Sequence, residues 1–165
     1  MLKQEKYMPN NCFLNQPNQI FCRRDFSCTG NEVVNPVLTN NFAYFNNLQG
    51  GTIVANGAIS QNYVRGSGLI LSDGNGGVLL PAGDYQITFN VSGTALAGQE
   101  IAVALSLNDL EISGSRVTGL LTSGGIANLN QTLIVTIQQT SNLKIVNYSS
   151  ESVQAVSSSL SIVKL

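Results

Sequence analysis

The feature of this sequence that most restricts its fold is a period-two alternation of apolar and polar residues, which recurs from residue 39 to the C-terminus. It is clearest in residues 85–91, 101–107 and 126–137, and turn residues such as those at 73–77 separate the runs. Residues 52–59 and 68–72 are predicted as further strands. Alternate residues of a strand face opposite sides of a sheet, so each run predicts a strand with one buried face. We expect about eight to ten antiparallel strands and no helix, packed as an all-β sandwich or barrel.

The first 36 residues differ from the rest, and we predict that residues 1–36 are a connector arm and residues 37–165 a separate β domain. Residues 1–34 carry 7 of the 17 charged residues and show neither helical nor strand periodicity. Their apolar side chains need a surface to pack on, either the chain's own β domain or a neighbouring subunit. The candidate anchors are Tyr7, Phe13, Leu14, Ile20, Phe21 and Phe26.

All three cysteines, Cys12, Cys22 and Cys28, lie in this arm. Their spacing matches no zinc-ligand pattern, and the chain has no histidine to complete one. An odd number leaves at least one thiol unpaired within the chain, so inert thiols and disulfides to neighbouring chains both remain open. We take all three as candidates for interchain disulfides. Arg23 and Arg24 follow Cys22 and favour its thiolate form, which makes exchange easier.

Charge is scarce, and this excludes several functions. Charged residues make up 10% of the chain and the net charge is −1, so no basic field exists to neutralise a nucleic acid. The absence of histidine removes histidine-based triads, metal sites and general bases. We therefore predict no enzymatic activity and no cofactor. A surface rich in Asn, Gln, Ser, Thr and Gly suits packing against copies of the same chain.

Two acidic motifs have both a chemical and a structural interpretation. Asp109 and Glu111 would share one face of a strand and could form a carboxylate pair, although two exposed carboxylates at a turn are far commoner. Residues 73–77 begin like a calcium-binding loop but lack the later ligands and the closing glutamate. We expect a plain turn at 73–77 and no catalytic pair at 109–111.

The N-terminal residues contain no apolar run of the kind found in a secretory signal peptide. No stretch approaches the roughly 20 apolar residues of a membrane-spanning helix. We expect the chain to be made and folded in a cytosol and to have no membrane partner.

Five segments of the β region resemble the TNF-like globular-head family when taken in order. They are residues 42–45, 80–89 with the pattern Pro-x-Gly-x-Tyr-x-hydrophobic-x-Phe, 133–137, 142–147 and 158–165. The resemblance is strongest to the C-terminal domain of BclA-type collagen-like glycoproteins of the bacterial exosporium, which share the low charge and the Ser-Leu-Ser-Ile-Val-Lys-Leu style of ending. It implies a ten-stranded antiparallel jelly-roll sandwich that assembles as a homotrimer, here with an extended N-terminal arm.

The sequence departs from BclA-type proteins before this domain, because a cysteine-bearing arm stands in place of a collagen stalk. That plan resembles the subunits of endospore appendage fibres, in which an N-terminal connector links jelly-roll heads. The resemblance implies a structural subunit whose trimers join head to tail into a fibre, made in the mother-cell cytoplasm and placed on the spore surface or exosporium. Its partners would be its own copies and spore-surface anchor proteins or glycans. The alternative is a trimeric adhesin or ligand-binding head of the exosporium or of an appendage tip.

The same resemblance places four residues of the β domain in the trimer core. These candidates are Tyr44, Tyr85, Phe89 and Leu160. For each of them, the alternative location is the ordinary hydrophobic core of a single chain.

Overall fold

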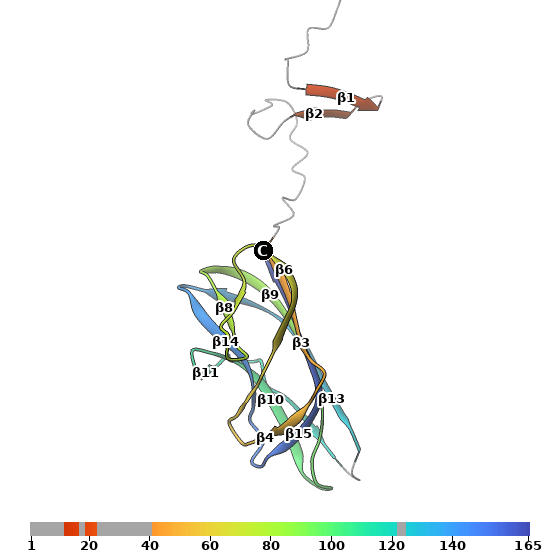
Figure 1. Cartoon of the computed structure of the whole chain (residues 1–165), viewed down its shortest axis with the longest axis vertical. Helices are drawn as coiled ribbons and strands as arrows, with labels where there is room; N and C mark the ends of the chain where they lie inside the picture. The colour runs from red at the N-terminus through yellow and green to blue at the C-terminus, as the bar shows by residue number, and fades with distance from the viewer. Residues whose placement is uncertain (1–11, 17–18, 23–40, 122–124) are drawn as a thin grey trace, which may run out of the picture. The chain divides into compact units, whose positions relative to one another are not determined.

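A computed structural model describes residues 12–16, 19–22, 41–121 and 125–165, all of which are strands, turns or irregular segments without a helix. The chain divides into two compact units, Met1–Val37 and Leu38–Leu165 (Figure 1). The boundary between them lies next to the predicted one at residue 36. Tyr7, Phe26 and Cys28, three of the predicted arm residues, lie outside the described residues.

The first unit contains a β-hairpin that the sequence did not predict. Strand β1 (Cys12–Gln16) pairs antiparallel with β2 (Gln19–Cys22). The register sets Cys12 opposite Cys22 and Phe13 opposite Phe21, with an irregularity between Leu14 and Gln16. The alternation that signals a strand is absent from these short runs, because the apolar residues stand together at 12–14 and 20–22 instead of alternating with polar ones.

The second unit consists of two antiparallel sheets lying face to face (Figure 1). The order of the first sheet is β13-β9-β15-β3-β6, with β4 also pairing β15. The order of the second is β11-β10-β14-β8-β7, with β12 pairing β10 and β5 pairing β14. The strands of the first sheet are β3 (Phe42–Asn47), β4 (Gly51–Ile53), β6 (Asn62–Ser67), β9 (Gly83–Thr94), β13 (Ala127–Ile137) and β15 (Val153–Lys164). Those of the second are β5 (Ala58–Ile59), β7 (Leu71–Ser72), β8 (Val78–Leu80), β10 (Glu100–Leu107), β11 (Leu110–Glu111), β12 (Val117–Leu120) and β14 (Ser141–Asn147).

The core lies between the two sheets, and β9 shows how the sequence builds it. Tyr85, Ile87, Phe89 and Val91 alternate inward and are buried, whereas the residues between them face outward. The second sheet contributes the facing layer, including Val103, Leu105, Leu143 and Ile145. The predicted all-β sandwich with alternating strands is confirmed.

Several local predictions were wrong. Residues 52–59 form two short strands instead of one, because a turn at Asn56, whose φ is +59°, separates β4 from β5. Residues 68–72 contribute only the two-residue strand β7, whereas β6 and β12 were not predicted. In the described part of the second unit the strands outnumber the ten expected, since several are segments of two or three residues.

Candidate self-association surface

The outer face of the first sheet is a regular array of uncharged polar side chains. Strand register places Thr132, Thr88, Ser161 and Tyr44 in one row across β13, β9, β15 and β3. The Oγ1 atoms of Thr88 and Thr132 are 2.8 Å apart, a hydrogen bond that links two strands across their outer face. Alternation makes this face polar, because the inward-facing residues of the same strands take the apolar positions. The adjacent row contains Asn130, Asn90, Ser159 and Asn46.

An apolar row runs beside these polar rows on the same face. Ile134, Val163 and Phe42 lie in register with Gln86 across the same four strands. Ile134 is 70% exposed, Phe42 40% and Val163 38%. Val163 and Phe42 are direct neighbours, whereas Gln86 lies between Val163 and Ile134. Exposed large apolar side chains gathered on one face are typical of a site that another surface covers.

Charge is confined to the margins of this sheet. Among its strands, all of which are described, the charged residues are Arg65 on the edge strand β6, Asp84 near the start of β9 and Lys164 at the end of β15. Asp84 accepts a hydrogen bond from the hydroxyl of Thr136, and Lys164 donates one to the carbonyl of Ala82. Burial of the central part would therefore require no charged group to lose its water, a step that costs several kcal/mol for each unpaired ion.

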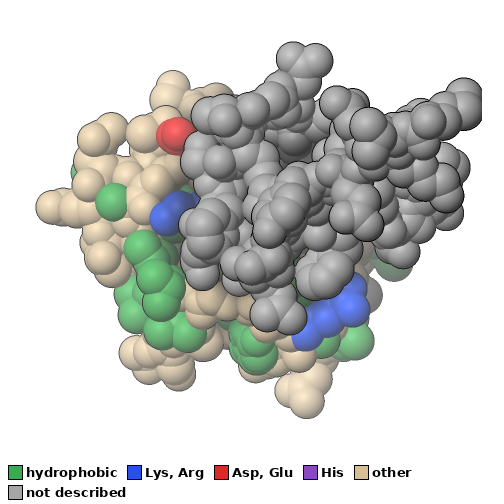
Figure 2. Space-filling model, turned by 90° about the horizontal axis from the view of Figure 1, so that it is seen from above, with side chains coloured by type: hydrophobic (Ala, Val, Ile, Leu, Met, Phe, Trp, Pro, Cys, Tyr) green, Lys and Arg blue, Asp and Glu red, His purple; other side chains and the backbone are tan. Residues whose placement is uncertain are grey.

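Figure 2 shows how sparse charge is on another side of the molecule. Apolar and uncharged side chains cover most of the described surface visible there, with few basic or acidic ones.

A hollow of about 230 Å³ opens on the outer face of the first sheet, where the register of β15 shifts between Ala155 and Ser157. Its lining is mostly hydroxyl and amide groups, from Tyr44, Leu48, Asn90, Ser92 and Ser157 to Ser159.

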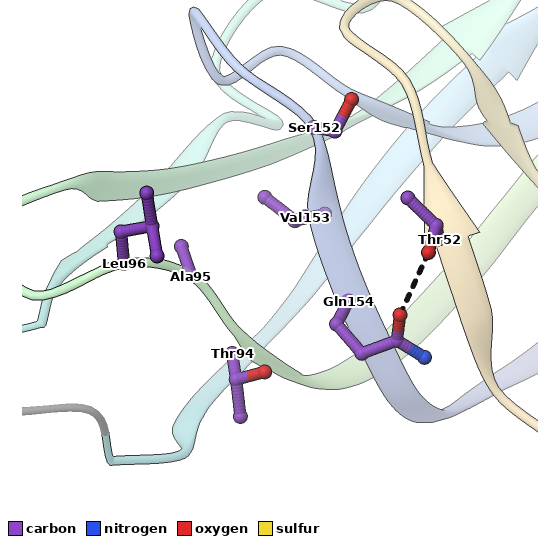
Figure 3. Close-up of a pocket in the computed structure, with 7 residues that line it drawn as sticks. All are labelled: Thr52, Thr94, Ala95, Leu96, Ser152, Val153 and Gln154. Carbon is purple, nitrogen blue, oxygen red and sulfur yellow. Dashed lines mark hydrogen bonds between the residues drawn. The ribbon is translucent and has the colours of Figure 1, made fainter.

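A shallow groove of about 290 Å³ lies at one end of the sandwich (Figure 3). It is lined by Thr52, Thr94, Ala95, Leu96, Ser152, Val153 and Gln154, and the hydroxyl of Thr52 donates to Oε1 of Gln154 across 2.9 Å. No charged residue lines it.

The groove is at the end of the sandwich opposite to the point where the chain enters it. The backbone N–H of Lys164 donates to the carbonyl of Asn41, so the entry point lies beside the end of β15, whereas Gln154 in the groove lies near its start. At about 3.3 Å per residue, the strand separates the two by about 33 Å. Leu96, Leu120 and Ile126 are exposed at the groove end, where they are adjacent to the ends of β9, β12 and β13.

The four predicted trimer-core residues do not share one location. Tyr85, Phe89 and Leu160 are fully buried in the core of the single chain and belong to no surface, whereas Tyr44 lies half-buried on the outer face. The Tyr85 hydroxyl donates to the carbonyl of Pro81, and burial raises the pKa of this phenol. The outward residues of the same strands, such as Thr88 and Ser161, were missed because the interpretation followed the apolar members of each alternating pair.

The acidic motifs have structural roles. Asp109 lies in the β10–β11 turn with a φ of +65° and pairs with Lys144 at 2.8 Å, while Glu111 binds Arg116 through two hydrogen bonds. The two carboxylates therefore have different cationic partners and form no pair. The hydrogen bond to Glu111 raises the pKa of Arg116 further above its usual range.

Asp73 organises the turn that was compared with a calcium loop. Its Oδ1 accepts from the N–H groups of Asn75 and Gly77 at 2.7 and 2.8 Å, and its Oδ2 accepts from the amide of Asn142 at 2.7 Å. Partial burial opposes ionisation, but these hydrogen bonds outweigh it, so the pKa of Asp73 lies below its ordinary value. The carboxylate is already used by the chain, as expected of a plain turn.

Among the described residues, no three His, Cys, Asp or Glu side chains gather in a way that could hold a metal ion. In the same residues, no helix has the length and apolarity needed to cross a membrane.

Comparison of the whole fold with solved structures gives a consistent result. The globular domain of a zebrafish complement 1qA protein matches with a TM-score of 0.56 and 8% identity, over 76% of this chain and 97% of that one. Eiger TNF from S. frugiperda matches with a TM-score of 0.60 and 14% identity, over 76% and 92% of the two chains. Murine APRIL matches with a TM-score of 0.55 and 13% identity, over 75% and 99%.

The β domain has the TNF-like jelly-roll fold. The resemblance found in the sequence is thereby confirmed at the level of fold. No protein-family model and no curated protein matches the chain. The identities of 8–14% establish the architecture alone.

Proposed function

We propose that this protein is a structural subunit that assembles with its own copies, first as a trimeric head and then as a fibre. The outer face of the first sheet is the observation that carries the proposal. Its centre is free of charge, its polar groups lie in regular rows, and Ile134, Val163 and Phe42 form an exposed apolar row beside them. These properties favour a surface that is buried against another protein, and they offer no group for catalysis.

A closed trimer can bury such a face on every subunit. Each subunit in a three-fold ring presents one patch to each neighbour, and the ring closes after three contacts. The TNF-like family that this chain resembles assembles as trimers, and the matched structures share its fold. Of the four residues predicted to lie in the trimer core, Tyr44 is the one on the outer face, where it lies in the central rows. It therefore stays a candidate for the contact between subunits.

The proposed linkage of trimers into a fibre is based on what lies at the two ends of the sandwich. The arm joins the β domain at the end where Asn41 lies, and the uncharged groove with Leu96 at its margin lies at the other end. An arm that binds the groove end of the next head would repeat without closing, which produces a filament. The apolar residues of the arm, including Phe13, Phe21 and Phe26, supply the side chains for such a contact. Cysteines in the arm would then make the link covalent.

Placement on a spore surface is a further part of the proposal, and it is supported by the likeness of the β domain sequence to BclA-type heads. Spore-surface anchor proteins or glycans would be the external partners. Immunogold labelling of sporulating cells of the source organism tests this part, since label confined to the vegetative cytoplasm would contradict it.

Removal of the arm tests the assembly proposal. The full-length chain should form filaments visible by negative-stain microscopy, whereas a chain of residues 38–165 should remain a soluble trimer. The shortened chain retains the core of the β domain, and circular dichroism checks that it is folded, so that a loss of filaments can be separated from unfolding. Filaments formed without the arm would overturn the fibre model. A ligand-binding head, the alternative, would retain its ligand affinity without the arm and form no filaments in either case.

A further inference from the structure

The strand register of the N-terminal hairpin places two of the three cysteines of the chain opposite each other. Strands β1 and β2 pair antiparallel with Cys12 directly opposite Cys22, Phe13 opposite Phe21 and Leu14 opposite Ile20. The sequence alone left all three cysteines equivalent, because their spacing along the chain says nothing about which two meet. The register of the backbone removes that equivalence.

Opposed positions of an antiparallel ladder meet the distance requirement of a disulfide. Their Cα atoms lie about 5.5 Å apart at a hydrogen-bonded pair and about 4.5 Å apart at the other kind of pair. Disulfides join residues whose Cα atoms are about 4.4–6.8 Å apart. Both kinds of position fall within this range, so the Cα spacing set by the register is compatible with a disulfide between Cys12 and Cys22.

We propose that Cys12 and Cys22 form an intrachain disulfide that closes the hairpin, which leaves Cys28 as the thiol available for a link between chains. Two thiols lose two protons and two electrons as the sulfur–sulfur bond forms, and dioxygen accepts them to become hydrogen peroxide. Arg23, next to Cys22, favours the thiolate that begins the reaction. The bridge itself does not depend on the proposed function, whereas the role of Cys28 does.

The bridge also explains how so short a hairpin can persist. The strands contain only five and four residues, and an isolated two-stranded hairpin is at best marginally stable in water. A cross-link near its open end reduces the conformational freedom of the unfolded segment and so favours the paired state.

Peptide mapping of the full-length protein tests the assignment, because trypsin separates the pair from the single cysteine. Cleavage after Lys6 and after Arg23 leaves Cys12 and Cys22 in one peptide, residues 7–23, while cleavage after Arg24 and Arg65 places Cys28 in residues 25–65. The protein is exposed to air, its remaining thiols are blocked with iodoacetamide without reduction, and it is then digested. Peptide 7–23 should be unmodified and two hydrogens lighter than its reduced form.

Three results would overturn the bridge. They are alkylation of both Cys12 and Cys22 in the oxidised protein, a link from either one to the peptide of Cys28, and two copies of peptide 7–23 joined together. A mixture of chains with natural and ¹⁵N-labelled nitrogen detects the last case, because a link between chains would give peptides of mixed isotope content. The measurement is made on the unaltered chain, so no variant has to fold.

Serine variants distinguish this proposal from the fibre model. Cys28→Ser should keep the bridge in peptide 7–23 and lose dimers on a non-reducing gel, whereas Cys12→Ser should lose the bridge and keep a dimer linked through Cys28. Covalent dimers that persist in Cys28→Ser would refute the role given to Cys28. Filaments are scored separately by microscopy, so failure of the fibre model and failure of the bridge give different results.

Discussion

Replacement of Ser161 by lysine tests whether the outer face of the first sheet is buried in the assembled protein. Ser161 lies in the middle of β15, opposite Thr88 on one side and Tyr44 on the other, and it is exposed in the single chain. A lysine at an exposed strand position leaves the core unchanged, so the subunit should fold normally. In a trimer formed through this face, the same lysine would be removed from water with no acidic partner nearby.

The expected loss of affinity is large. The effective penalty for burying an ion in a protein is several kcal/mol, and we take about 3 kcal/mol for each ammonium group. Three copies in a trimer add up to about 9 kcal/mol, which lowers the association constant by six to seven powers of ten. Trimers stable at micromolar concentration should therefore become monomers.

Sedimentation velocity on residues 38–165 measures this effect without interference from the arm. Thr118→Lys is the matched control, because Thr118 is also an exposed strand residue but lies on the second sheet, opposite Ala102. It should remain trimeric, and circular dichroism should show that both variants are folded. A Ser161→Lys trimer as stable as that of the unaltered domain would refute the assignment of this face.

Two further predictions concern stability. Asn147→Ala should lower the free energy of unfolding by about 2–3 kcal/mol, because this buried amide donates to the carbonyls of Ile53, Val54 and Glu151. Urea denaturation measures the loss. As a control, Asn128→Ala should change the free energy of unfolding little, because Asn128 is exposed. Asp73 has a lowered pKa in the folded state, so its contribution to stability is present above its ordinary value of 3.8 and is lost as the pH falls through the folded value. Asp73→Asn should therefore be less stable than the unaltered chain at neutral pH, and the gap should narrow in acid; a constant gap from pH 7 to 2 would contradict the inferred role.

The alternation of side chains let the sequence predict much of the fold. In β9, each apolar residue predicted to face inward is buried, because the two-residue period of a strand is a local property of the backbone. The family resemblance added the jelly-roll topology, which the matched structures confirm. The predictions failed where a few residues decide the outcome, as at Asn56, where one positive φ divides a predicted strand in two.

The candidate surface was only partly predictable. The sequence showed that the β domain has few charges, but it could not show that Arg65, Asp84 and Lys164 lie at the margins of one sheet, because strand order brings distant segments together. The sequence also left open whether Tyr85, Phe89 and Leu160 lie between subunits or in the core of the single chain, and all three fill the core of the single chain. An apolar side chain is expected to be buried, but its type does not show whether its own chain or a neighbouring subunit buries it.

The sequence by itself indicated the longer strands and their inward faces, since these follow from the local alternation of apolar and polar residues. Only the tertiary structure decided which residues share a surface. Strands far apart in the chain place Ile134, Val163 and Phe42 in one exposed row, and the hairpin register sets Cys12 opposite Cys22. The order of strands that lie far apart in the chain is decided by the packing of the whole domain, whereas the register of a hairpin depends on its strand pattern and on the length and type of its turn.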